Sequence, residues 1–157
     1  MKTLFITLTT LCFSYIIGMG QSDYYSHKLT KKAATSLLID IGSITLDAMG
    51  DAYFDMGKKE VGKLLQASST GLLIAQPFLI DFNKEDFWWK IPAYTLLRFA
   101  IFDAVYNTTR GLPYYYNGST SHYDNVMSEL MPGRFSTFPK AMALTVGISL
   151  TLRYGKE

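Results

Sequence analysis

The chain has 157 residues, which is enough for one domain with a modest core and too few for two. Charged residues make up 18% of it and hydrophobic residues 48%, a composition on the boundary between soluble and membrane proteins. The formal net charge is only +2, and acidic residues are interleaved with the lysines. We therefore expect no nucleic acid partner, because no basic surface of the kind that binds one is present.

The first twenty residues have the organisation of a secretory signal. Lys2 supplies a basic start, a long apolar run follows, and the small residues Gly18 and Gly20 precede the expected cleavage site. An uncleaved signal anchor is the alternative, because the run is close to the length that spans a bilayer. We therefore expect a signal peptide or anchor over residues 1–20, one helical domain over residues 21–157, and a location in the membrane or cell envelope.

Two long helices are expected in the first half of the mature chain. The first covers residues 31–56, and Gly57 is placed to end it, because glycine readily adopts the left-handed conformation of helix C-termini. The second covers residues 59–80, where Pro77 should kink it or end it early. This second helix carries small residues every four positions, a pattern that lets another helix approach closely in lipid. These small residues are Ala67, Gly71 and Ala75.

A charged turn over residues 81–86 separates the second helix from the third. An aromatic and basic cluster, Phe-Trp-Trp-Lys at residues 87–90, then precedes a third helix over residues 91–107. In a membrane protein such a cluster forms an interfacial belt, and in a soluble protein it forms a docking surface or part of the core. Residues 111–133 are rich in turn formers and read as a long loop, with a short helix over residues 123–130 as an option within it.

The last segment fits two patterns. Residues 144–154 alternate strictly between apolar and small or polar side chains, which is typical of a strand. The competing interpretation is a helix capped by Thr137, with Pro139 in its first turn. We favour the helix because the preceding segments are helical, and because a lone strand in lipid would leave its backbone polar groups unpaired. The sequence thus predicts an all-α fold, a small bundle of three to four helices that is embedded in the membrane.

Carboxylates on the first helix are the main candidate site. Asp47, Asp51 and Asp55 are four residues apart, so they lie on one face and repel one another unless a cation or a partner intervenes. We expect them to face inward as a polar seam that pairs with Arg98 of the third helix. Carboxylate oxygens are also the ligands that Mg²⁺ prefers, so a Mg²⁺ or Mn²⁺ site is an alternative.

The third helix and the loop after it supply the other candidate residues. Arg98 and Arg110 could pair with the aspartates or neutralise a phosphate. Asp103, Tyr106 and Asn107 form, with Arg110, a polar cluster near the helix end. The aromatic loop is a candidate partner-binding surface, because long ordered loops in compact domains are often functional. Its candidate residues are Tyr114, Tyr115, Tyr116, His122 and Asp124.

Three functions are compatible with these features. The first is a small exported multi-pass or membrane-associated protein with a binding or structural role, which contacts the lipid bilayer and either a protein partner or a second copy of itself. The second is a divalent-cation-dependent membrane enzyme that acts on a lipid or phosphorylated substrate. The third is a soluble envelope protein whose aromatic loop binds a partner. No sequence motif decides whether the chain is an enzyme.

Overall fold

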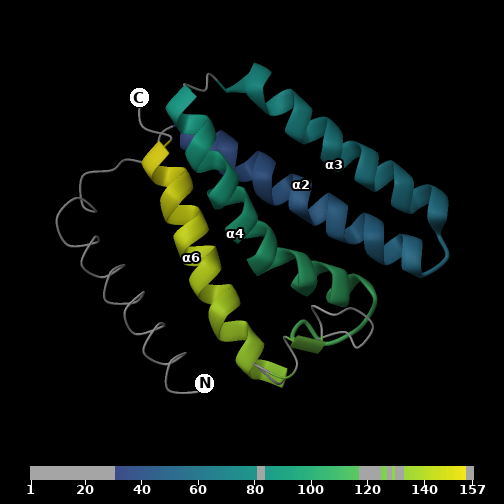
Figure 1. The fold of residues 1–157 in the computed structure, drawn as a ribbon. Coiled ribbons are helices and arrows are strands. Elements are labelled where there is room, and N and C mark those ends of the chain that lie inside the picture. The colour runs from purple at the N-terminus through teal and green to yellow at the C-terminus, as the bar shows by residue number, and fades with distance from the viewer. Residues whose placement is uncertain (1–30, 81–83, 117–124, 127–128, 130–132, 155–157) are drawn as a thin grey trace.

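Four α-helices form the fold in the computed structural model, which describes residues 31–80, 84–116, 125–126, 129 and 133–154 (Figure 1). The helices are α2 (Lys31–Asp55), α3 (Lys59–Leu79), α4 (Lys84–Thr109) and α6 (Thr137–Tyr154), and a 3₁₀ turn, η2 (Gly133–Ser136), precedes α6. An all-α bundle is therefore confirmed for the described residues. The expected signal, His122 and Asp124 lie outside them.

The helices run alternately in opposite directions, and α2 lies at the centre of the arrangement. α3 packs against α2, α4 packs against another side of α2, and α6 packs mainly against α4 (Figure 1). α2 and α4 therefore start at one end of the bundle, where α3 and α6 finish. Because α3 and α6 lie on the outside, each of them leaves a broad face without a helical neighbour among the described residues.

Two glycines in the left-handed conformation end the helices α2 and α4. Gly57 has a φ of 81°, and Lys58 N–H donates to the Tyr53 carbonyl at 2.9 Å, which closes the last turn of α2. Gly111 has a φ of 74°, and Leu112 N–H donates to the Asn107 carbonyl at 2.8 Å in the same way. The expected end of the first helix at Gly57 is confirmed.

Helix contacts are closest where glycine replaces a side chain. A Cβ atom on Gly62 of α3 would lie only 2.7 Å from the Gly50 carbonyl oxygen of α2, so the two backbones touch. On α6, a Cβ atom on Gly147 would lie 2.9 Å from Leu97 of α4. By contrast, Gly71 in the expected small-residue stripe has no neighbour within 4 Å and is exposed. The stripe therefore faces outward, away from α2.

The start of the third helix differs from the expectation. α4 begins at Lys84, so the second half of the expected charged turn and the whole aromatic cluster belong to its first turns. The expected start near residue 91 is therefore wrong by about two turns, and Pro92 lies inside the helix. Acidic residues are common in the first turn of a helix because of the helix dipole, and the sequence has Glu85 and Asp86 there.

The other helices agree more closely with the sequence. α3 continues to Leu79, beyond Pro77, and Ile80 N–H still donates to the Gln76 carbonyl at 3.0 Å, so the proline does not end the helix early. α6 is a helix, so the strand alternative for residues 144–154 is wrong over the described part, to Tyr154. Of the optional short helix, Asn125, Val126 and Glu129 are described, and they are helical.

Candidate functional site

Polar contacts at intervals of about two turns join α2 to α4, and we call them the α2–α4 ladder. Its contacts are Lys90 with Asp40, Arg98 with Asp47, and Tyr106 with Asp55. The contacting residues advance by seven or eight positions on each helix, which is close to two helical turns of about 7 residues. Because the contacts follow the same order and similar steps on both helices, α2 and α4 run parallel. The polar contacts lie along the sides of the two helices that face each other.

The first contact of the ladder is a buried ion pair. The Asp40 side chain is 0% exposed, and Lys90 Nζ lies 2.5 Å from its Oδ2 atom. Gln76 of α3 donates to the other oxygen, Oδ1, at 3.1 Å, and Lys90 also donates to Ser36 Oγ at 2.7 Å. Removing a carboxylate and an ammonium from water is costly unless charge and hydrogen bonds compensate both groups. Here both oxygens of the carboxylate are compensated.

The second contact is more open. Arg98 Nη1 binds Asp47, and the Arg98 guanidinium lies 4.4 Å from the centre of the Phe102 ring, one turn further along α4. The Arg98 side chain is 40% exposed and that of Asp47 is 25% exposed. A guanidinium above an aromatic face gains a further electrostatic attraction from the ring. Arg98 is therefore held by a carboxylate and a ring together.

Polar contacts also join α2 to α3. The hydroxyls of Ser43 and Ser69 lie 2.9 Å apart, and Ser69 Oγ donates to the Ser43 carbonyl at 2.8 Å. Gln66 Nε2 donates to Asp51 Oδ1 at 2.5 Å. These contacts, with Gln76 on Asp40, place hydrogen bonds along most of the α2–α3 interface. Hydrogen bonds therefore accompany the apolar and glycine contacts on the side of α2 that faces α3.

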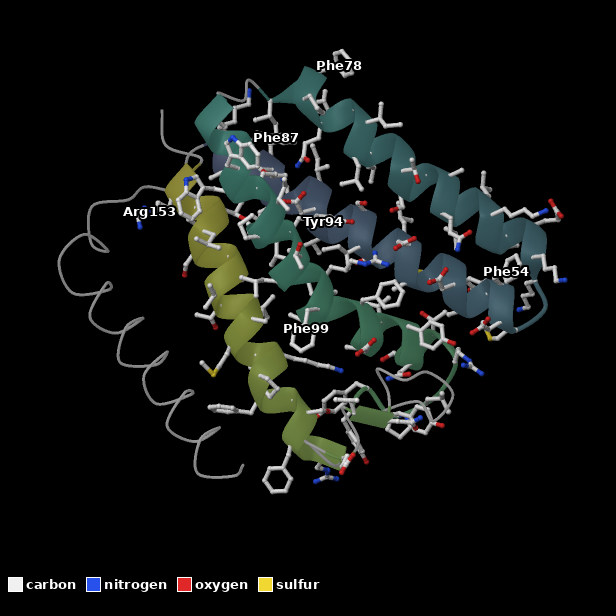
Figure 2. All side chains as sticks on the ribbon, in the orientation of Figure 1. Phe54, Phe78, Phe87, Tyr94, Phe99 and Arg153 are labelled. Carbon is white, nitrogen blue, oxygen red and sulfur yellow. The ribbon has the colours of Figure 1, made fainter. Side chains whose placement is uncertain are left out.

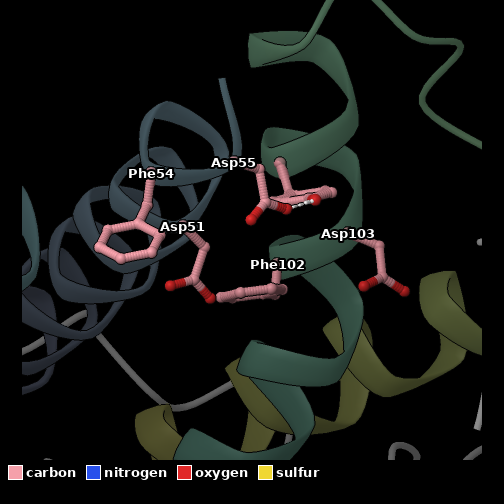
Figure 3. A pocket seen from close by; sticks show the side chains of 6 residues that line it. Asp51, Phe54, Asp55, Phe102 and Asp103 are labelled. Atoms are coloured by element: carbon pink, nitrogen blue, oxygen red, sulfur yellow. Dashed lines mark hydrogen bonds between the residues drawn. The ribbon is translucent and has the colours of Figure 1, made fainter. Parts of the chain in front are cut away.

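The third contact of the ladder forms one wall of a hollow at the end of the bundle. Tyr106 donates its hydroxyl proton to Asp55 and accepts a hydrogen bond from Arg110 at 2.6 Å. The hollow measures about 310 Å³, and Figure 3 shows carboxylates from both helices around it. Its lining residues are Asp51, Phe54, Asp55, Phe102, Asp103 and Tyr106.

Acidic groups and aromatic rings suit a positively charged occupant, but the protein supplies its own cations here. Arg110 lies 3.8 Å from Asp55 and 5.3 Å from the centre of the Tyr106 ring. Arg98 covers the Phe102 ring, and Lys140 of α6 lies 2.8 Å from Asp103. The hollow is therefore an acidic and aromatic surface whose charge is largely balanced from within the bundle.

The expected polar cluster near the end of α4 is divided between three neighbours. Tyr106 and Arg110 turn toward Asp55 of α2, whereas Asp103 pairs with Lys140 of α6. Asn107 is buried, and its amide donates to the backbone carbonyls of Tyr114 and Tyr116, at 3.4 and 2.8 Å. Asn107 thus fixes the chain that leaves α4 and does not share a site with Asp103.

The start of the expected partner-binding loop lies against this end of the bundle. Tyr114 and Tyr115 pack edge to face with ring centres 5.1 Å apart, and the Arg134 guanidinium lies 5.5 Å from the Tyr115 ring centre. Tyr114 and Tyr116 are exposed. Partner binding by this loop stays a prediction.

The aspartates proposed as metal ligands do not converge. Within the described ranges, no three Asp, Glu, His or Cys side chains are placed to hold a metal ion. Asp47, Asp51 and Asp55 instead meet a guanidinium, an amide and a phenol. Residues four apart rise about 6 Å along a helix and rotate around it, so each carboxylate reaches a different neighbour. The geometry favours these groups as partners of protein donors.

The sequence interpretation identified Arg98 as a partner of the aspartates but did not identify the partners of Asp40 at the buried end of the ladder. Lys90 was assigned to an aromatic surface, and Gln76 was not considered. A signal was available, because Lys90, Arg98 and Tyr106 recur every eight residues, which is close to the steps of seven and eight residues from Asp40 through Asp47 to Asp55. Lys140, the partner of Asp103, carries no comparable signal, since its pairing depends on where α6 packs.

Comparisons with known proteins add nothing to this geometry: no protein-family model, no curated protein and no solved structure matches the chain.

Proposed function

We propose that the protein is a small membrane-embedded helical bundle of the cell envelope with a structural or binding role. On this proposal the apolar outer faces of the helices contact lipid, and the polar side chains of α2 hold the bundle together from within. The observation that carries the proposal is the distribution of polarity between buried and exposed positions, which is the reverse of that in water-soluble proteins.

Most buried positions in the described residues are small or polar, and the large apolar exceptions are Ile39, Ile44, Ile80 and Leu97. Of the nine buried apolar residues five are alanine, and nine further buried residues are polar or charged, among them Asp40, Lys140 and Gln76. Such an interior gives a bundle in water little hydrophobic driving force, because burial of large apolar side chains supplies most of it. In lipid the driving force comes instead from close packing and interhelical hydrogen bonds, which this interior provides.

Exposed positions carry the large apolar side chains. Leu38 is 72% exposed, and on α3 the segment from Leu64 to Ile80 contains no charged residue. Large exposed apolar patches on monomeric soluble proteins mark an interaction with membrane or protein. Exposed hydroxyls on the helices also donate to carbonyls four residues earlier, so they need no water. Examples are Ser68 to Leu64, Thr70 to Gln66, Thr95 to Ile91 and Ser149 to Thr145.

The helix lengths are compatible with a bilayer. α2, α3 and α4 have 25, 21 and 26 residues, or about 30 to 40 Å at 1.5 Å per residue. By length and composition, one helical stretch in the described part of the chain, Arg134–Arg153, is apolar enough to cross a membrane. Core helices of soluble proteins also pass this test, so the proposal rests on the polarity reversal. α2 and α4 are long enough but less apolar than this stretch, because α2 carries the inward aspartates and α4 carries Arg98.

Alkaline carbonate extraction tests the proposal. We expect the full-length protein, expressed in cells that process its N-terminal signal, to stay in the membrane pellet after the wash and to dissolve only in detergent. A known peripheral protein in the same membranes serves as the control for effective washing. Release of the protein together with that control would contradict membrane embedding and favour a soluble envelope protein.

A further inference from the structure

Large apolar side chains gather at the end of the bundle where α3 finishes and α4 begins. Figure 2 shows Phe78 and Phe87 at this end, whereas Phe54 lies at the far end of α2. Phe78 is 86% exposed and Trp88 is 72% exposed, so the described residues leave both largely uncovered. We call this group the aromatic end cluster. It consists of Phe78, Leu79, Phe87, Trp88, Trp89 and Ile91.

The composition of this cluster suits the boundary between hydrocarbon and water. Phe78 and Leu79 are wholly apolar, whereas Trp88 and Trp89 combine an apolar ring with one N–H donor. Phe87 packs against Trp88 edge to face, with ring centres 6.2 Å apart, so the two rings share one surface. Tryptophan is enriched at the headgroup level of membranes, where its ring meets acyl chains and its N–H meets phosphate or carbonyl oxygen.

Charged residues at the same end indicate the chemistry of the occupant. Lys31 at the start of α2 and Arg153 in the last turn of α6 are both exposed, and both lie at this end because the helices alternate in direction. Glu85 and Asp86 precede the cluster in α4, while Lys90 is turned inward to Asp40. Exposed cations at the same end of the bundle as exposed indoles complement lipid phosphate.

We infer that Trp88 and Trp89 lie in the phosphate and carbonyl layer of the bilayer, with Phe78 and Leu79 reaching into the acyl chains. This inference rests on the proposed membrane embedding and specifies how deep the aromatic end cluster lies in the bilayer. The α3–α4 junction marks one face of the membrane, and the α2–α3 turn lies toward the other.

Tryptophan fluorescence tests the depth directly, because Trp88 and Trp89 are the only two tryptophans of the chain. The full-length protein is reconstituted into phosphatidylcholine vesicles whose acyl chains carry bromine either near the carbonyl end or near the methyl end. We expect quenching by the shallow bromines to be at least about twofold stronger than quenching by the deep ones. The variants Trp88→Phe and Trp89→Phe report on each indole separately, with helix content by circular dichroism as the control for folding.

Other outcomes overturn the inference in distinguishable ways. Stronger quenching by the deep bromines would place the cluster inside the hydrocarbon. Quenching by aqueous iodide alone, in protein that resists carbonate extraction, would place the cluster in water, where a protein partner could bind it. The membrane proposal itself would then still stand. Release by carbonate would remove the membrane proposal itself, whatever the fluorescence reports.

Discussion

Single residues along α2 differ in how far their charges are buried. The side chains of Asp40, Asp47 and Asp55 are 0%, 25% and 50% exposed. A buried ion pair is costly to break, because removing one partner leaves an uncompensated charge, whereas an exposed pair contributes little. The contacts of the α2–α4 ladder should therefore differ in their contribution to stability. Loss of the partner should cost most free energy of unfolding at Asp40.

Replacing Lys90 tests the buried end of this gradient. We expect Lys90→Met to lower the free energy of unfolding by about 3 kcal/mol, because Asp40 loses the cation that pairs with it among the described residues while it stays buried. The double variant Asp40→Asn/Lys90→Met should recover most of this loss, since the charge that needed compensation is gone. Denaturant unfolding in detergent micelles, followed by circular dichroism, measures both values.

Lys63→Met is the matched control, because the Lys63 side chain is 63% exposed and pairs, within the part of the chain that the structure describes, with Glu60 one turn earlier. We expect this control to change the free energy of unfolding by less than about 0.5 kcal/mol. If Lys90→Met were no more destabilising than Lys63→Met, the Asp40 contact would not hold the bundle together.

The exposed end of the ladder gives the opposite expectation. Tyr106→Phe removes the hydroxyl that links Asp55 to Arg110 but leaves the ring stacked on Phe102. Because Arg110 remains 3.8 Å from Asp55, the loss of stability should be only about 1 kcal/mol. The same unfolding measurement checks this, and a loss as large as that of Lys90→Met would contradict the gradient.

Among the helices, α3 presents two different faces. The face toward α2 contains Gly62, whose absent side chain allows backbone contact with Gly50, and the outward face contains Gly71 in open space. One residue type thus has two roles on one helix. At Gly62 it permits close packing, and at Gly71 it only lowers helix propensity, by about 1 kcal/mol relative to alanine.

Alanine substitution at these two glycines should therefore have opposite effects. Gly62→Ala would place a Cβ atom 2.7 Å from the Gly50 carbonyl oxygen, so the helices must separate, at a cost of about 1 to 3 kcal/mol. Gly71→Ala meets nothing within 4 Å and should stabilise the protein by up to about 1 kcal/mol. Unfolding of both variants in the same detergent gives the comparison. Equal effects would mean that α3 does not pack on α2 through Gly62.

The helices were predictable from the sequence because their signals are local. Gly57 ends α2 as expected, and α3 and α6 lie within a few residues of their expected ranges. The start of α4 was predicted too late, because the charged residues before the aromatic cluster were interpreted as a turn, and charged residues occur both in turns and in the first turn of a helix. Which small residues lie at a helix contact depends on tertiary packing, so Gly50 and Gly62 were missed while Gly71 was emphasised.

The candidate site was predictable only in part, for the same reason. Helical spacing identified one polar face on α2, and Arg98 as the cation that could reach it. The partner of Asp51 is Gln66 of α3, and that of Asp103 is Lys140 of α6. These pairings depend on the register between helices, which helical periodicity alone does not determine. The carboxylates on the face that looked suited to a metal ion therefore each bind a different donor group of the protein.

At the scale of the whole molecule, the alternating direction of the helices divides the charged ends into two groups. The α2–α3 turn carries Lys58 and Lys59, and the opposite end carries Lys31 and Arg153. Between the ends, the outer face of α3 is uncharged, and charges elsewhere are mostly turned toward neighbouring helices. If the bundle crosses a bilayer, these two ends must lie on opposite sides of it.

Cysteine labelling tests this separation, because Cys12 is the only cysteine of the chain and can be replaced by serine. In the Cys12→Ser background, Lys59→Cys and Arg153→Cys place single thiols at exposed positions on the two ends. A membrane-impermeant maleimide added to sealed vesicles of one orientation should label one variant and not the other, because the reagent cannot cross the hydrocarbon core. Both variants should label equally after detergent is added, which controls for thiol accessibility. Equal labelling before detergent would show that both ends lie on one side, and the bundle would then rest on the membrane surface without crossing it.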